Sequence, residues 1–125
     1  MGILIPNITN AKDIPCIEVK TLEIKNIYEK NDTSICKDWN LTKADVEAFF
    51  KTAEPFAFSA QFNEFDILNC EASGELIFNG VNRKYSINHG GSAFIYGFGT
   101  EQQGYGCREG ECLKYVDYVP FDDED

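Results

Sequence analysis

The side chains that could perform chemistry in this sequence are five cysteines and a single histidine, His89. Cys107 and Cys112 flank the tetrapeptide Arg-Glu-Gly-Glu, a spacing that suits half of a zinc site or a small disulfide loop. A structural zinc site needs four ligands, whereas Cys70 and His89 each stand alone in the sequence, so zinc is disfavoured. The five cysteines are Cys16, Cys36, Cys70, Cys107 and Cys112.

A disulfide between Cys107 and Cys112 would form only in an oxidising compartment. The first residues lack the basic n-region and the long apolar stretch of a signal peptide, so none is predicted. A cytoplasmic protein is therefore expected. We therefore expect buried, unreactive thiols, of which at least one must be unpaired because the number is odd. If an export signal has been removed, the protein would instead be periplasmic and its thiols could be paired.

Catalysis and cofactor binding are disfavoured. His89 precedes Gly90 and Gly91 in a predicted turn, where a histidine is usually exposed, and no signature marks any cysteine as a nucleophile. Neither glycine pair, 97/99 or 104/106, lies between a predicted strand and a predicted helix. No lysine follows either pair at the spacing of a phosphate-binding loop. We expect no enzyme, no metal and no cofactor. A small enzyme would have a deep pocket around His89 or the cysteines.

Charge points to a protein partner. The net charge is −10, and residues 61–125 account for −8 of it with twelve acidic and four basic side chains. Such a field disfavours nucleic acid and anionic membranes and attracts a basic protein. Phenols stand among carboxylates near the C-terminus, which suits anchoring and steering of a partner. The candidate partner-binding residues are Glu101, Tyr105, Glu109, Glu111, Tyr115, Asp117, Tyr118, Asp122 and Asp123. The alternative is a solvated acidic edge that serves solubility alone.

The elements that must position these residues begin with a strand and a helix. Residues 16–28 alternate between apolar and polar side chains, with a shift of one residue between Val19 and Leu22 that predicts a bulge. Residues 41–54 have helical periodicity. Thr42 and Asp45 form a capping-box pattern before this helix, and Pro55 ends it.

A meander of strands is predicted to follow. Residues 67–79, 83–88 and 92–98 have strand patterns, separated by turns at Asn79-Gly80 and at 89–91, and residues 113–119 could add a last strand. The predicted fold is α+β, an antiparallel sheet of about four to five strands with one main helix packed on it. Residues 1–125 form a single domain with an irregular lead-in at 1–15 and an acidic tail at 120–125.

A loose pattern of residues runs through most of the chain: Cys36-Lys-Asp-Trp39, Leu41, Val46, Phe49-Phe50, Cys70, Gly74, Leu76, Gly80, Tyr85, Ile87-Asn88, Gly90-Gly91 and Gly106-Cys107. In this pattern the sequence resembles a small bacterial family of single-domain proteins, of which several look exported. It is also similar in size and acidity to immunity proteins of contact-dependent growth-inhibition and other polymorphic toxin systems. That resemblance implies a monomer that binds a cognate basic toxin domain, often a nuclease, and covers its active site. The alternative is an exported or lipid-tethered envelope domain with structural disulfides.

Overall fold

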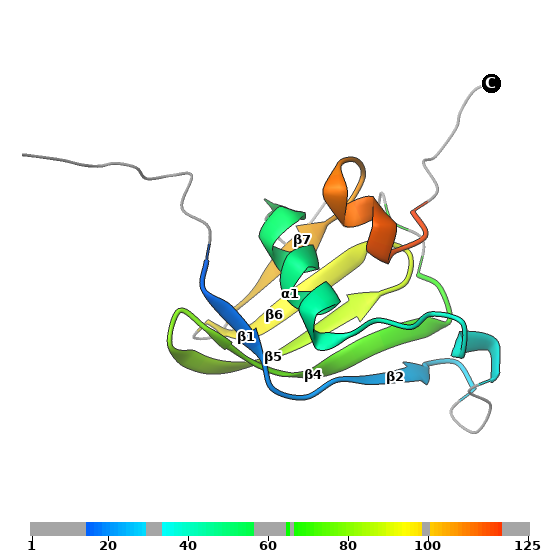
Figure 1. Ribbon diagram of the computed structural model, residues 1–125, viewed down its shortest axis with the longest axis horizontal. Coiled ribbons are helices and arrows are strands. Elements are labelled where there is room, and N and C mark those ends of the chain that lie inside the picture. Colours follow the sequence, from blue (N-terminus) through cyan, green and yellow to red (C-terminus); the bar gives the residue numbers. More distant parts are fainter. Residues whose placement is uncertain (1–14, 30–33, 57–64, 66, 99–100, 119–125) are drawn as a thin grey trace, which may run out of the picture.

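A computed structural model describes residues 15–29, 34–56, 65, 67–98 and 101–118 (Figure 1). The predicted lead-in and acidic tail lie almost entirely outside these residues. The helices are η2 (Ser34–Cys36), α1 (Lys43–Thr52) and η4 (Glu111–Tyr115), of which η2 and η4 are short 3-10 helices. The strands are β1 (Ile17–Val19), β2 (Glu23–Asn26), β3 (Glu54–Phe56), β4 (Cys70–Phe78), β5 (Val81–Asn88), β6 (Ser92–Phe98) and β7 (Glu101–Gly106).

The strands form one antiparallel sheet that curls into a half-barrel, and α1 lies across one face of it (Figure 1). The strand order is β1-β4-β5-β6-β7-β3. The strand β2 also pairs with β4, at residues 70–73, whereas β1 pairs with residues 76–78 of the same strand. The predicted α+β class with one main helix is therefore confirmed. The predicted number of four to five strands is wrong, because the described residues contain seven. The two unexpected strands at the far side, β7 and β3, complete the curl.

The first predicted strand is interrupted by the bulge that its pattern indicated. Val19 lies opposite Leu76 and Glu23 lies opposite Ser73, so that residues 20–22 face only two residues of β4. The extra residue divides the predicted strand into β1 and β2. Inside the bulge, the Thr21 carbonyl oxygen would lie 2.2 Å from a Cβ atom at position 74. Gly74 is therefore required by this close approach of two backbones.

The helix begins with the predicted capping box. The Thr42 hydroxyl accepts a hydrogen bond from the Asp45 amide at 3.1 Å, and the Thr42 amide donates to the Asp45 carboxylate at 2.9 Å. The helix ends at Thr52, two residues earlier than predicted, and Pro55 lies in β3. Val46, Phe49 and Phe50 turn inward and bury the predicted apolar stripe against the sheet.

The predicted meander is confirmed through β4, β5 and β6, with a tight turn in which Asn79 and Gly80 both have positive φ. The predicted strand over 113–119 is wrong for residues 113–118, the part of it that the structure describes. The 3-10 helix η4 occupies residues 111–115 instead, because a disulfide between Cys107 and Cys112 holds the chain in a tight loop directly after β7. The described helices include none with the length and apolar composition to cross a bilayer.

Candidate partner-binding surface

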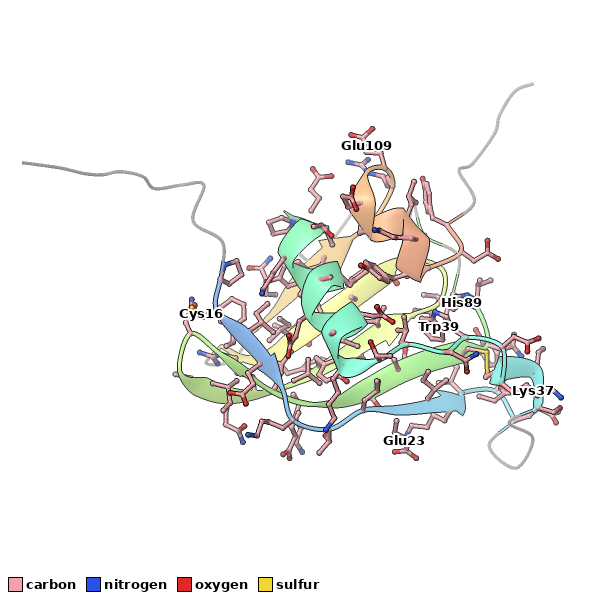
Figure 2. All side chains as sticks on the ribbon, viewed as in Figure 1. Cys16, Glu23, Lys37, Trp39, His89 and Glu109 are labelled. Carbon is pink, nitrogen blue, oxygen red and sulfur yellow. A yellow bond between two sulfur atoms is a disulfide. The ribbon has the colours of Figure 1, made fainter. Side chains whose placement is uncertain are left out.

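Four of the five cysteines are joined in two disulfides, so the expectation of unpaired thiols is wrong. Cys36 in η2 is bonded to Cys70 at the start of β4, and Cys107 after β7 is bonded to Cys112 in η4. Cys16 is the free cysteine, and it is exposed. In Figure 2, Cys16 and His89 lie on opposite sides of the molecule. The described residues therefore contain no nucleophilic pair of a thiol and an imidazole.

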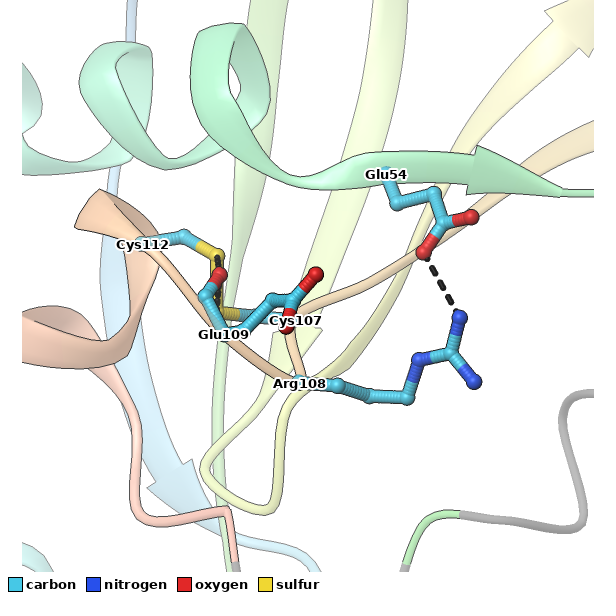
Figure 3. Close-up of polar contacts among 5 residues, drawn as sticks. All are labelled: Glu54, Cys107, Arg108, Glu109 and Cys112. Atoms are coloured by element: carbon cyan, nitrogen blue, oxygen red, sulfur yellow. Dashed lines mark hydrogen bonds and ion pairs between the residues drawn. A yellow bond between two sulfur atoms is a disulfide. The ribbon is translucent and has the colours of Figure 1, made fainter.

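The segment 107–112, which we call the disulfide loop, is closed by the bond between Cys107 and Cys112, and its backbone approaches the sulfur atoms of that bond. The Glu109 carbonyl oxygen lies 3.5 Å from Cys112 Sγ, a contact without a hydrogen bond because a disulfide sulfur carries no proton (Figure 3). Gly110 has a φ of +88°, which few other residues adopt, and so allows the loop to reverse. Glu109 lies at the outer end of the loop (Figure 2).

Neighbouring segments hold the disulfide loop in place. The Arg108 guanidinium forms a 2.8 Å ion pair with the Glu54 carboxylate at the start of β3 (Figure 3). The Cys107 amide donates a 2.9 Å hydrogen bond to the Gly91 carbonyl oxygen in the β5–β6 turn. The helix η4, which contains Cys112, packs against α1. Three separate parts of the chain thus fix the loop's position and reduce its freedom to move.

A second set of contacts connects η4 to the segment before α1. The Trp39 indole nitrogen donates a 2.7 Å hydrogen bond to the Tyr115 carbonyl oxygen. The Trp39 ring stacks on the His89 ring with 4.4 Å between their centroids. The Asp117 amide donates to the His89 carbonyl oxygen at 2.7 Å. Partial burial lowers the pKa of His89, against a smaller opposing effect of the Asp117 charge, so the imidazole is neutral at physiological pH.

The expectation that His89 is solvent-exposed is therefore wrong. Its ring is half-buried, and it joins the β5–β6 turn to Trp39. Each of these residues comes from a different part of the chain. The sequence predicts neither the stacking of Trp39 on His89 nor the hydrogen bond from Trp39 to Tyr115. Both contacts depend on how the sheet and η4 bring distant residues together.

Most of the predicted binding residues that the structure describes belong to one stretch, from the disulfide loop through η4 to residue 118, which lies at one end of the molecule (Figure 1). Glu109, Glu111 and Asp117 are exposed there, and Tyr115 and Tyr118 are half-buried. We call the three carboxylates the acidic end. The Glu111 carboxylate is 3.1 Å from the Lys114 ammonium group, whereas the Glu109 side chain contacts no other described side chain through an ion pair or hydrogen bond.

The remaining predicted residues lie elsewhere. Tyr105 is only 5% exposed, and its ring packs edge-on against Phe50 in the core with 5.1 Å between centroids. This burial raises the pKa of Tyr105 to about 12 and leaves little of its ring for a partner. Glu101 begins β7, and its side chain is outside the described part of the structure. Asp122 and Asp123 also lie outside the described residues.

The described carboxylates are distributed over more than the acidic end. Glu71 and Glu75 alternate with the buried Ala72 and Leu76 along β4, so their side chains point to the sheet face opposite α1. Figure 2 shows Glu23 and Glu109 at opposite ends of the molecule. Within the described residues, no three histidine, cysteine or carboxylate side chains are close enough to hold a metal ion.

Comparisons of this chain with protein-family models, with curated proteins and with solved structures find no match.

Proposed function

We propose that this protein is an inhibitor of the immunity-protein type, which binds a basic toxin domain and covers its active site with the acidic end. The disulfide loop is the observation that carries this proposal. It presents Glu109 on a backbone that a disulfide closes and that Arg108 and Cys107 attach to neighbouring segments. A backbone segment held in one position before binding loses less conformational freedom when the complex forms.

The proposed partner follows from the charge of this surface. A toxin that cleaves nucleic acid needs a positively charged cleft to bind phosphates. Glu109 and Asp117 are exposed carboxylates that could occupy such a cleft, and the net charge of −10 would speed the encounter. The half-buried rings of Tyr115 and Tyr118 beside them could supply apolar contact area.

Co-expression tests this proposal. The C-terminal domain of the protein encoded immediately upstream should stop bacterial growth, and this protein should restore it. The double variant Glu109→Lys and Glu111→Lys should lose protection and bind the domain at least tenfold more weakly at low salt, because the charge of the acidic end is reversed. Glu23→Lys, at the opposite end of the molecule, is the matched control and should protect fully. Full protection by the double variant would refute the role of the acidic end.

The two disulfides favour a second candidate, an exported or lipid-tethered envelope domain. Disulfides persist in oxidising compartments and are rare in the cytoplasm, so the pairing of Cys36 with Cys70 and of Cys107 with Cys112 is more typical of an exported protein. Thiol labelling of the protein in its own cells, with acid quenching before lysis, distinguishes the compartments. Labelling of Cys16 alone would support export. Labelling of all five cysteines would exclude export, and it would also show that the closed loop on which the inhibitor proposal rests is open in the cell.

A further inference from the structure

The sheet face opposite α1 carries a groove that the acidic end does not use. Part of this face is covered, because Asn88, Ser92 and Phe94 point away from α1 and yet are less than 10% exposed. Farther along the same strands the described residues leave an open groove of about 480 Å³. Side chains of β4, β5, β6 and the bulge line it, chiefly Thr21, Ser73, Glu75, Lys84, Ser86 and Tyr96.

Two features of the groove suit a ligand that both donates and accepts hydrogen bonds. Glu75 and Lys84 lie directly opposite one another on β4 and β5, and neither charged group has a hydrogen bond or ion pair with any described side chain. The hydroxyls of Ser86 and Tyr96 are 3.0 Å apart. Since each hydroxyl has one donor and two acceptor positions, both keep capacity for a further partner.

We propose that this groove binds a neutral saccharide. Sugar hydroxyls can donate to the Glu75 carboxylate and accept from the Lys84 ammonium group, and the C–H face of a sugar ring can pack on the Tyr96 ring. The volume is that of a small-molecule site. This binding site is independent of the acidic end and of the inhibitor function proposed above.

Other ligand classes fit the groove less well. A phosphate group would meet the Glu75 carboxylate and a protein of net charge −10, both of which repel it. A wholly apolar ligand would displace water from the Ser86 and Tyr96 hydroxyls without replacing the hydrogen bonds of that water. An extended peptide binds sheets through unpaired backbone groups at an edge, whereas this groove lies on the face of β4 and β5, which are both interior strands.

Titration of the ¹⁵N-labelled full chain with maltotriose, with chitotriose and with xylotriose tests the proposal by NMR. At least one trisaccharide should cause saturable shifts of amides at residues 73–75, 84–86 and 96. Tyr96→Ala should weaken this binding about tenfold, since the ring contact is lost. The double variant Glu75→Gln and Lys84→Gln should also weaken it. Both of its side chains are exposed, so this variant should remain folded even if Tyr96→Ala does not.

Tyr28→Ala is the matched control, because Tyr28 is an exposed tyrosine outside the groove, and this variant should bind as the unaltered chain does. The proposal is overturned if no trisaccharide gives saturable shifts, if the shifts fall outside the groove, or if the groove variants bind normally. It is equally overturned if inorganic phosphate causes the same shifts. Growth protection by the inhibitor surface should be unchanged in the groove variants, so failure of one proposal is distinguishable from failure of the other.

Discussion

The two disulfides should contribute unequally to stability, because they close loops of very different length. A cross-link stabilises a protein mainly by reducing the entropy of the unfolded chain, and the effect grows with the number of residues between the cysteines. Cys36 and Cys70 are 34 residues apart, which corresponds to about 3.8 kcal/mol at 25 °C. Cys107 and Cys112 are 5 residues apart, which corresponds to about 2 kcal/mol.

Replacing each pair by two alanines isolates these contributions. All four side chains are buried, so each replacement also removes two buried sulfur atoms, and this cost is similar in the two variants. The variant without Cys36–Cys70 should therefore be less stable than the variant without Cys107–Cys112 by roughly 1.5–2 kcal/mol. A loss of about 4 kcal/mol is a large part of the 5–15 kcal/mol that typically stabilises a domain.

Urea unfolding followed by tryptophan fluorescence measures the difference, since Trp39 is buried in the folded state. Both variants should be made in a Cys16→Ser background, because the exposed free thiol could exchange with the remaining disulfide. Equal stability of the two variants, or a larger loss from the short loop, would refute the loop-length argument. A change in the slope of the transition would show instead that the unfolded states differ in compactness.

Three further changes test the fold. Thr42→Ala should cost about 1 kcal/mol in urea unfolding because the helix loses its capping bonds, and Thr42→Ser should restore most of it. Gly74→Ala should cost about 2 kcal/mol or more, because its Cβ would meet the Thr21 carbonyl oxygen, whereas Ser73→Ala should change little. Burial lowers the pKa of His89, so folding favours the neutral imidazole, and its contribution is complete above the usual pKa of 6.5 and lost as the pH falls below it. His89→Gln should therefore lose less stability than the unaltered chain on acidification, and an unchanged pH profile would contradict this.

The parts of the fold that depend on neighbouring residues could be predicted from the sequence. The capping box at Thr42 and Asp45, the turn at Asn79-Gly80 and the bulge between β1 and β2 each have a local cause, and each is present. In such places the preference of the residue and the demand of the tertiary structure agree. The antiparallel order of β4, β5 and β6 follows, because short turns leave neighbouring strands few other ways to pair.

The missed strands lack that local agreement. Proline at position 55 is typical of a helix end, but it is tolerated in β3 because an edge strand leaves some amide positions unpaired. Gly104 and Gly106 in β7 have low strand propensity, so this segment carries no strand pattern of its own. They are opposite Phe94 and Ser92 of β6 in the observed register, and the pairing between strands, rather than their own preference, makes them extended.

The candidate site was predictable only where it is continuous in sequence. Glu109, Glu111 and Asp117 can be grouped from the sequence because they are close together along the chain, and their role in binding a partner stays a prediction. The disulfide between Cys36 and Cys70 could not be found, since no spacing indicates a partner 34 residues away and a reducing compartment was expected. The carboxylates near Tyr105 in the sequence predict a binding role for it at the surface, but strand alternation turns its ring toward Phe50.

The bond between Cys36 and Cys70 closes the chain from residue 36 to residue 70 into a covalent ring. This ring contains α1 and β3, and it is closed at the first residue of β4. A protease that cut the backbone once inside this ring would produce two pieces that stay joined and migrate as one molecule until a reductant is added. After such a cut, α1 would remain connected to the rest of the chain by the backbone on its uncut side. Whether a single cut releases part of the chain therefore depends on the redox state of this one bond.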